Sequence, residues 1–218
     1  MAIDETQTVT EIAVDDVTLE GELVVPADAG GLVVFAHGSG SSRHSPRNNF
    51  VAETLRKRGL GTLLFDLLTE DEDRHRENRF DIPLLTDRLV AATAWARDRN
   101  DLSADLPIGY FGASTGAAAA LRGAARSETD VDAVVSRGGR VDMAEDAIGD
   151  VTAATLFIVG GEDDSVLELN REVYDALSCE KDLRVIEGAG HLFQGEGELE
   201  AVADHAADWF ATHLRNRG

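Results

Sequence analysis

Short apolar runs alternate with helical segments through most of the chain. The run Leu32–Ala36 is continuously apolar, as expected of a strand buried on both faces of a sheet. Further strands are expected at 61–65, 106–111, 131–135, 154–159 and 183–186. Helices are expected at 48–58, 82–98, 115–126, 167–177 and 198–214. Because buried strands alternate with helices, the pattern predicts a mostly parallel, doubly wound sheet.

The chain begins differently. Residues 8–14 and 17–25 alternate polar and apolar side chains, and the turn-like Asp15-Asp16 separates them, which predicts an antiparallel hairpin. The charged segment 69–79 is expected to be a surface loop or a short helix. No insertion is long enough to form a separate lid. The sequence therefore predicts one α/β domain over residues 1–218, with helices on both faces of the sheet.

The charge excludes some classes of partner. Asp and Glu number 41 against 20 Lys and Arg, which gives a net charge of −21, and only Lys57 and Lys181 are lysines. Such a field repels nucleic acid and anionic membranes, so neither is an expected partner. Ordinary solubility does not require so few lysines. We therefore favour adaptation to high salt, where counterions screen the self-repulsion.

The expected location is the cytoplasm. No stretch approaches the roughly 20 apolar residues that span a bilayer, and residues 1–6 are acidic, unlike a secretory signal. Cys179 is the only cysteine, so no intrachain disulfide can form, which suits a reducing compartment.

The segment Gly112-Ala-Ser-Thr-Gly116 matches the pattern G-x-S-x-G. It lies between an expected buried strand and an alanine-rich helical run. This pattern is a device for holding a serine hydroxyl on a sharp strand-to-helix turn, and its glycines remove side chains that would collide with the turn. Ser114 is therefore the candidate nucleophile.

An acid and a histidine follow two later strands. Ligands bind beyond the carboxyl ends of parallel strands, and His191 comes directly after the last expected strand. A serine needs such a base, and the base needs an acid that orients it. Glu162, Asp163 and Asp164 compete for the acid; we favour Asp163, with Asp164 next. The order Ser, Asp, His is the one expected of a hydrolase nucleophile elbow.

The loop after 32–36 reads His37-Gly38-Ser39-Gly40. Negative charge on a substrate carbonyl oxygen requires preorganised N–H donors. The backbone amides of Thr115 and Ser39 are the expected pair. A phosphate-binding glycine loop is the alternative, but the Gly-Lys-Ser/Thr ending of a P-loop is missing.

Several strand-end residues are candidates for binding a substrate. The candidates are His37, Arg43, Arg137 and Arg140, and Arg47 also lies in these strand-end loops. The arginines could bind a carboxylate or phosphate through two parallel hydrogen bonds, or they could pair with local Asp and Glu. No Cys/His cluster has zinc spacing and no acidic run has a calcium-loop pattern, so neither a metal nor another cofactor is expected.

These motifs resemble the α/β-hydrolase superfamily, and within it the dienelactone hydrolase-like group. The carriers are His37–Arg47, Phe65–Leu68, Gly112–Gly116, Ser136–Arg140, Gly160–Asp163 and Gly188–Phe193. They look like small lidless hydrolases that also occur fused to phosphoribosyltransferase-like domains. The resemblance implies Ser114 as nucleophile, Asp163 as acid and His191 as base. Dienelactone hydrolases proper carry a cysteine nucleophile, so Ser114 implies a generic carboxylic ester as substrate.

The expected function is hydrolysis of a small ester or thioester through an acyl-enzyme. A hydrolase-fold binding module is one alternative. An acyltransferase or peptidase using the same three residues is another, because only the acceptor or the leaving group differs. The sequence leaves the oligomeric state open.

Overall fold

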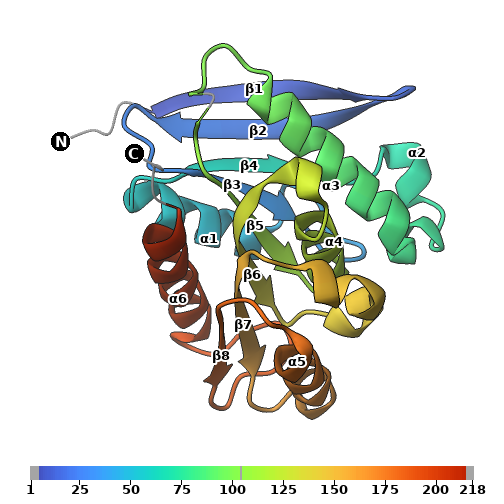
Figure 1. The fold of residues 1–218 in the computed structure, drawn as a ribbon, viewed down its shortest axis with the longest axis vertical. Helices are drawn as coiled ribbons and strands as arrows, with labels where there is room; N and C mark the ends of the chain where they lie inside the picture. Colours follow the sequence, from blue (N-terminus) through green and yellow to red (C-terminus); the bar gives the residue numbers. More distant parts are fainter. Residues whose placement is uncertain (1–4, 104, 215–218) are drawn as a thin grey trace.

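The computed structural model describes residues 5–103 and 105–214. All strands within these ranges form one eight-stranded sheet in the order β1-β2-β4-β3-β5-β6-β7-β8 (Figure 1). The strands are β1 (Glu5–Val14), β2 (Val17–Pro26), β3 (Leu32–Ala36), β4 (Gly61–Phe65), β5 (Ile108–Ala113), β6 (Val131–Arg137), β7 (Ala154–Gly160) and β8 (Lys181–Ile186). Residues 1–4 and 215–218, the ends of the predicted domain, lie outside the described residues.

The sheet has an antiparallel beginning and a parallel remainder. Strand β1 pairs with β2, and β2 with β4, in antiparallel register, whereas β3 to β8 pair in parallel. The predicted N-terminal hairpin and the mostly parallel α/β sheet are confirmed. The parallel strands therefore end at a common edge, where polar side chains from distant segments can meet.

Helices cover both faces of the sheet (Figure 1). The α-helices are α1 (Pro46–Lys57), α2 (Glu70–Asp73), α3 (Ile82–Arg97), α4 (Thr115–Ala124), α5 (Asp164–Ala176) and α6 (Glu198–His213). Short 3₁₀ helices are η1 (Asn78–Phe80), η2 (Ser127–Thr129) and η3 (Val141–Asp150). Helices α1 and α6 pack against each other on one face, while α3, α4 and η3 pack on the other.

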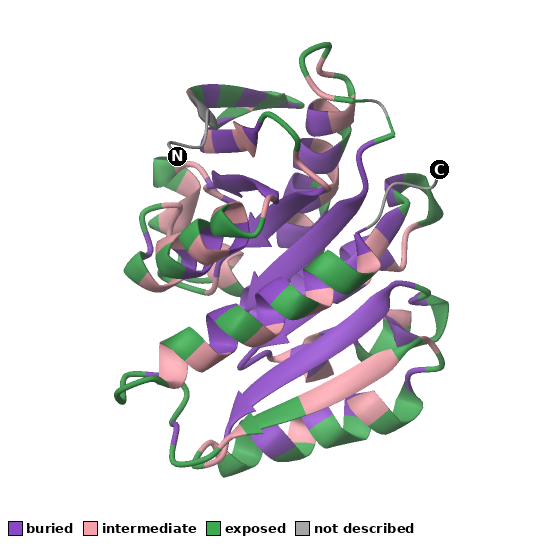
Figure 2. Cartoon of the chain, turned by 90° about the vertical axis from the view of Figure 1, so that its left-hand side faces the viewer, coloured by how far each residue is buried: buried purple, intermediate pink, exposed green. Residues whose placement is uncertain are grey.

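The central strands are buried on both faces. In β3, Val33 and Phe35 belong to the core under α1 and α6, whereas Leu32 and Val34 belong to the core under α3 and α4. Figure 2 shows buried residues filling the middle of the sheet, while the outermost strand carries intermediate and exposed ones. Burial on both faces explains why β3 has no polar residue.

The structure shifts several predicted boundaries. The strand predicted at 106–111 spans Ile108–Ala113, so it runs directly into the serine turn. The helix predicted from 167 begins at Asp164, because Asp163 occupies the N-cap position. The charged segment 69–79 contains the short α2, whose Thr69 and Glu72 form a reciprocal capping box. Helix η3 was not predicted.

Candidate active site

Ser114 occupies the turn between β5 and α4. Its backbone has φ 52° and ψ −119°, a left-handed value that a non-glycine residue adopts only under constraint. The Ser114 N–H donates to the carbonyl oxygen of Arg137 over 3.1 Å, and its own carbonyl accepts from Ala117 and Arg140. These bonds hold the turn in place, and the Ser114 residue remains half-exposed.

The glycines of the motif permit this turn. A Cβ at Gly112 would overlap the backbone of Ala117, and a Cβ at Gly116 would overlap the carbonyl oxygen of Ala36. Helix α4 can therefore start close to β3 and β5 only because both positions lack a side chain. The sequence motif and the observed turn agree in this respect.

Asp163 and His191 form a direct hydrogen bond. His191 Nδ1 lies 2.6 Å from Asp163 Oδ2, and the two side chains are 39% and 14% exposed. Both follow neighbouring strands, β7 and β8, at the carboxyl edge of the sheet. A histidine that donates Nδ1–H to a carboxylate presents Nε2 as the free base, so this geometry suits general-base chemistry.

Asp163 differs from the other two candidate acids in its position at the start of α5. An aspartate at an N-cap commonly accepts a hydrogen bond from the helix. Asp163 makes no such capping bond, and its carboxylate faces His191 instead. Of the three acids considered from sequence, the structure brings Asp163 to the histidine, while Glu162 and Asp164 are exposed.

Close backbone packing positions the His191 loop. A Cβ at Gly160 would overlap the carbonyl oxygen of Ala189, and the N–H of Glu162 donates to that same oxygen over 2.9 Å. On the opposite side, a Cβ at Gly138 would lie 3.4 Å from His191 Cε1 and Nδ1. The imidazole therefore packs against the end of β6, directly after the residue that binds the Ser114 N–H.

The loop after β3 lies against the serine. A Cβ at Gly38 would stand 3.1 Å from Ser114 Cβ. The Ser39 N–H, one expected oxyanion donor, donates to Thr115 Oγ1 over 2.9 Å. Thr115 is the first residue of α4, so its own N–H belongs to the set that lacks an intrahelical partner. Sequence reasoning missed the Thr115 hydroxyl contact, because a bond between residues 76 positions apart leaves no local pattern.

His37 was expected to contact substrate, but protein groups engage both of its ring nitrogens. Nε2 accepts from the N–H of Leu67 over 3.0 Å, and Nδ1 lies 3.0 Å from the carbonyl oxygen of Gly38. Burial lowers the pKa of His37, while its bond to Gly38 opposes this effect. The neutral ring therefore ties the loop to the end of β4 and has no free nitrogen for a ligand.

The structure separates the strand-end arginines into two groups. Arg43 binds the carboxylates of Asp66 and Glu20, and Arg140 binds both oxygens of Asp142 at 2.9 Å. Both arginines therefore make the local ion pairs that the sequence left open as the alternative to substrate binding. Arg137 is 9% exposed, and its side chain forms no ion pair with any described residue.

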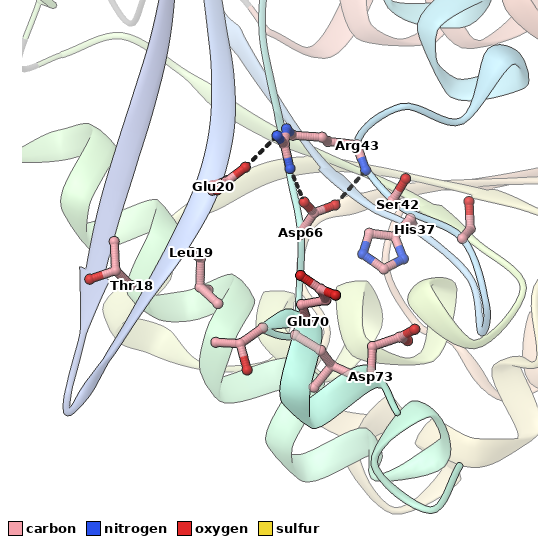
Figure 3. Close-up of a pocket in the computed structure, with 12 residues that line it drawn as sticks. Thr18, Leu19, Glu20, His37, Ser42, Arg43, Asp66, Glu70 and Asp73 are labelled. Carbon is pink, nitrogen blue, oxygen red and sulfur yellow. Dashed lines mark hydrogen bonds and ion pairs between the residues drawn. The ribbon is translucent and has the colours of Figure 1, made fainter. Parts of the chain in front are cut away.

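A cavity of about 320 Å³ lies beside the loop that follows β3, between β2 and α2 (Figure 3). It is lined by Thr18, Leu19, Glu20, His37, Ser41, Ser42, Arg43, Asp66, Leu68, Thr69, Glu70 and Asp73. Its walls include neither Ser114 nor the Asp163–His191 pair. Figure 3 shows Arg43 between Glu20 and Asp66, so the groups that restrain the loop form part of this wall.

No group of three or more His, Cys, Asp or Glu side chains among the described residues is arranged to hold a metal ion. No helix in the same part of the chain has the length and apolar character of a membrane span.

A serine on a strained strand-to-helix turn, at the carboxyl edge of this sheet, defines an α/β-hydrolase fold. The crystal structure of dienelactone hydrolase from Anabaena variabilis superposes with a TM-score of 0.93 at 50% identity, covering 97% of this chain and 99% of that one. The chain belongs to the dienelactone hydrolase-like group of the α/β-hydrolase superfamily. No family model matches the sequence.

More distant and longer proteins are also similar. Est1E from Butyrivibrio proteoclasticus shares the fold, with a TM-score of 0.80 at 17% identity over 94% of this chain and 98% of that one. A Mycobacterium tuberculosis protein named "Putative phosphoribosyl transferase" is 53% identical over 208 residues. That match covers 95% of this chain and 47% of the relative, so the chain spans about half the length of the curated proteins it matches.

Proposed function

We propose that this chain is a serine hydrolase that cleaves a small carboxylic ester or thioester through an acyl-enzyme on Ser114. One observation carries the proposal: the hydrogen-bonded Asp163–His191 pair sits at the strand edge that also holds Ser114 on its strained turn. A carboxylate-oriented imidazole that can reach a serine hydroxyl is the arrangement that activates a nucleophile.

The first half of the proposed cycle forms the acyl-enzyme. His191 Nε2 accepts the Ser114 Oγ proton as Oγ bonds to the substrate carbonyl carbon. Asp163 accepts Nδ1–H and stabilises the imidazolium that results. The tetrahedral intermediate then collapses, and His191 returns the proton to the departing alcohol or thiol. In the second half, His191 takes a proton from the water that attacks the acyl carbon. When this second tetrahedral intermediate collapses, His191 returns the proton to Ser114 Oγ, and the acid is released.

The charge on the substrate oxygen requires two donors. The N–H groups of Thr115 and Ser39 are proposed for this role. Because the Ser39 N–H donates to Thr115 Oγ1 in the structure, the substrate oxygen would replace that hydroxyl as its partner. In this proposal Thr115 contributes its backbone N–H, and its hydroxyl gives up the Ser39 N–H to the substrate oxygen.

The proposed substrate is small. Among the described residues, the helix that follows β4 spans only Glu70–Asp73, too short to cover a long acyl chain. A net charge of −21 disfavours contact with anionic lipid surfaces. The phosphoribosyl transferase name of the mycobacterial relatives refers to proteins about twice as long, and that activity is not part of the proposal.

A fluorophosphonate probe tests the proposal directly, because it reacts only with an activated serine. The expected result is a single adduct on Ser114, absent from Ser114→Ala, together with turnover of short p-nitrophenyl esters. No adduct and no turnover would reject the serine hydrolase. Ligand-induced stabilisation without turnover would indicate a binding module. Faster product formation with an added alcohol or amine acceptor would indicate an acyltransferase.

A further inference from the structure

The loop between β3 and α1, residues 37–45, is tied at both ends to the residues that follow β4. At its start, His37 Nε2 accepts from the N–H of Leu67 over 3.0 Å. Near its end, the N–H of Arg43 donates to Asp66 Oδ1 over 2.7 Å. Two consecutive residues, Asp66 and Leu67, therefore hold both ends. We call residues 37–45 the donor loop, because they include one of the proposed oxyanion donors.

The side chain of Arg43 strengthens the second of these contacts. Its Nη1 pairs with Asp66 Oδ2, and its Nη2 pairs with Glu20 Oε2 (Figure 3). Asp66 thus accepts from the backbone of Arg43 with one oxygen and from the guanidinium with the other. The Arg43 and Asp66 side chains are 18% and 20% exposed, whereas Glu20 is 66% exposed. Because solvent and salt screen a shielded pair less than an exposed one, Asp66 is the stronger partner of Arg43.

The middle of the donor loop depends on restraint from outside it. Gly38 and Gly40 flank Ser39, and Gly40 has a φ of 69°, so this part has little stiffness of its own. It lies against the serine turn, since a Cβ at Gly38 would stand 3.1 Å from Ser114 Cβ. The Ser39 N–H donates to Thr115 Oγ1 over 2.9 Å. In the proposed reaction the substrate oxygen takes the place of this hydroxyl, so the bond that fixes Ser39 in the free protein is given up during turnover.

The contacts at the ends of the donor loop are not exchanged in this way. Oxyanion donors accelerate a reaction because they are already placed where the negative charge develops. A displacement of about 1 Å, even one caused by a change remote from the reacting atoms, can cost about 100-fold in rate. Arg43 and Asp66 supply no group to the proposed reaction, so an effect of either residue on the rate passes through the loop.

We propose that Asp66 and Arg43 are positioning residues, whose contact holds the donor loop so that the Ser39 N–H meets the substrate oxygen during the reaction. The inference rests on the proposed function and adds to it two residues that act without touching the substrate. An ion pair that only stabilised the fold would leave the rate constants of the folded enzyme unchanged. The positioning role instead predicts a specific loss of transition-state stabilisation.

Steady-state kinetics with a short p-nitrophenyl ester test this role. Asp66→Ala removes both contacts to Arg43, so we expect kcat to fall about 10- to 100-fold while KM changes by less than about 3-fold, as when an interaction made in the transition state is lost. Asp66→Asn should be intermediate, because its amide oxygen can still accept the Arg43 N–H but carries no charge. The matched control is Arg122→Ala, which breaks an ion pair between α4 and η3 and should keep the kcat of the parent.

A transition-state analogue separates positioning from a general loss of activity. An alkyl trifluoromethyl ketone forms a hemiketal on Ser114, whose oxygen carries the charge that the donors bind. Its Ki should rise in Asp66→Ala by about the factor by which kcat/KM falls. Arg43→Gln combined with Asp66→Ala should lose little more than Asp66→Ala alone, because the two residues act through one contact. If Asp66→Ala does not fold, Arg43→Gln carries these tests and should resemble Asp66→Asn, since it removes the ion pair and keeps the backbone bond.

Hydrogen exchange reports on the donor loop without catalysis. Peptides that span residues 38–45 should exchange faster in Asp66→Ala than in the parent, because the amides there lose the restraint from β4. Peptides from the buried strand β3 should exchange at the same rate in both proteins. Arg122→Ala should leave the exchange of the donor loop unchanged.

The outcomes separate the positioning role from the serine hydrolase. If the parent hydrolyses esters and Asp66→Ala keeps its kcat and its affinity for the ketone, the hydrolase stands and the positioning role is overturned. An equal fall of kcat in Arg122→Ala would also overturn it, because the effect would not be specific to the donor loop. If the parent neither hydrolyses esters nor reacts with a fluorophosphonate, the proposed function is rejected. Faster exchange confined to the donor loop would then support its restraint by Asp66 and Arg43, and unchanged exchange would overturn that as well.

Discussion

Asp163 stands at the start of a helix, yet its carboxylate leaves the helix uncapped and binds His191. An N-cap aspartate that binds its own helix contributes about 1 kcal/mol. The Asp163 carboxylate does not make that bond and instead orients the imidazole of His191. The residue thus serves the site at some cost to α5, a trade that is common at functional positions.

Substitution of Asp163 and of Asp164 in turn should show which of the two carboxylates the reaction requires. Asp163→Asn would present an amide to His191 Nδ1 and favour the wrong tautomer, so we expect kcat for a short p-nitrophenyl ester to fall about 10⁴-fold. Asp164→Asn, the matched control one residue along, should retain activity close to that of the parent. A large loss confined to Asp164→Asn would contradict the assignment. Circular dichroism of both variants checks that the fold is intact.

His37 predicts a pH dependence of stability. Burial holds its pKa below the usual value near 6.5, so the unfolded chain binds its proton at a higher pH than the folded chain. Stability from this residue is therefore complete above about pH 6.5 and is lost as pH falls toward the folded-state pKa. Protonation of Nε2 would also break its bond to the Leu67 N–H.

The comparison that tests this is His37→Asn against the parent, with Tm measured at pH 7.5 and 5.5. The variant should start from a lower Tm, because it loses the bond to Leu67, but its Tm should depend less on pH. When the melts are converted to free energies of unfolding, the pH slopes of the two proteins should differ by at most about 1.4 kcal/mol per pH unit, the limit for one proton. Parallel pH profiles for the two proteins would contradict the argument.

At the scale of elements, the sequence predicted what depends on local pattern. The strand β3 and the helix α3 follow from apolar runs and helical periodicity, and both appear close to the predicted bounds. The turn at Ser114 follows from its glycines. The partners of the arginines could not be predicted in this way. Arg43 meets Asp66 across 23 positions, and which charges meet depends on how strands align in space.

Gly160 shows how one element fixes another. A methyl group there would collide with the carbonyl oxygen of Ala189, so Gly160→Ala should displace the loop that carries His191. We expect a loss of about 1–3 kcal/mol, the usual cost of overpacking, and a lower kcat. Gly149→Ala is the control, since a Cβ there meets nothing within 4 Å. Its Tm should change little, and equal losses in both variants would refute the packing argument.

At the scale of the whole molecule, the net charge of −21 sets the balance between folding and self-repulsion. Arginine–carboxylate pairs such as Arg126–Asp87 are exposed and contribute little individually. Repulsion among the remaining carboxylates acts over the whole surface. Salt shortens the Debye length from about 10 Å at 0.1 M to about 3 Å at 1 M, so it removes most of this repulsion.

We therefore expect Tm to rise as KCl increases from 0.1 to 2 M in calorimetric or fluorescence melts. Sucrose at matched osmolality is the control, because it stabilises proteins by exclusion from the surface without screening charge. A Tm that is independent of KCl, or that rises equally in sucrose, would argue against adaptation to high salt.

Among the described residues, the strand β8 lies at the edge of the sheet and pairs only with β7. It has exposed residues such as Val185, which is 39% exposed. Edge elements with little burial open at a lower free energy than the core. Opening of β8 would carry His191 away from Asp163 while the central strands stayed folded. In a urea titration, activity should therefore disappear at a lower concentration than the far-ultraviolet circular dichroism signal, and coincident transitions would contradict this. The proposed base would then report on the opening of this edge strand, ahead of the unfolding of the core.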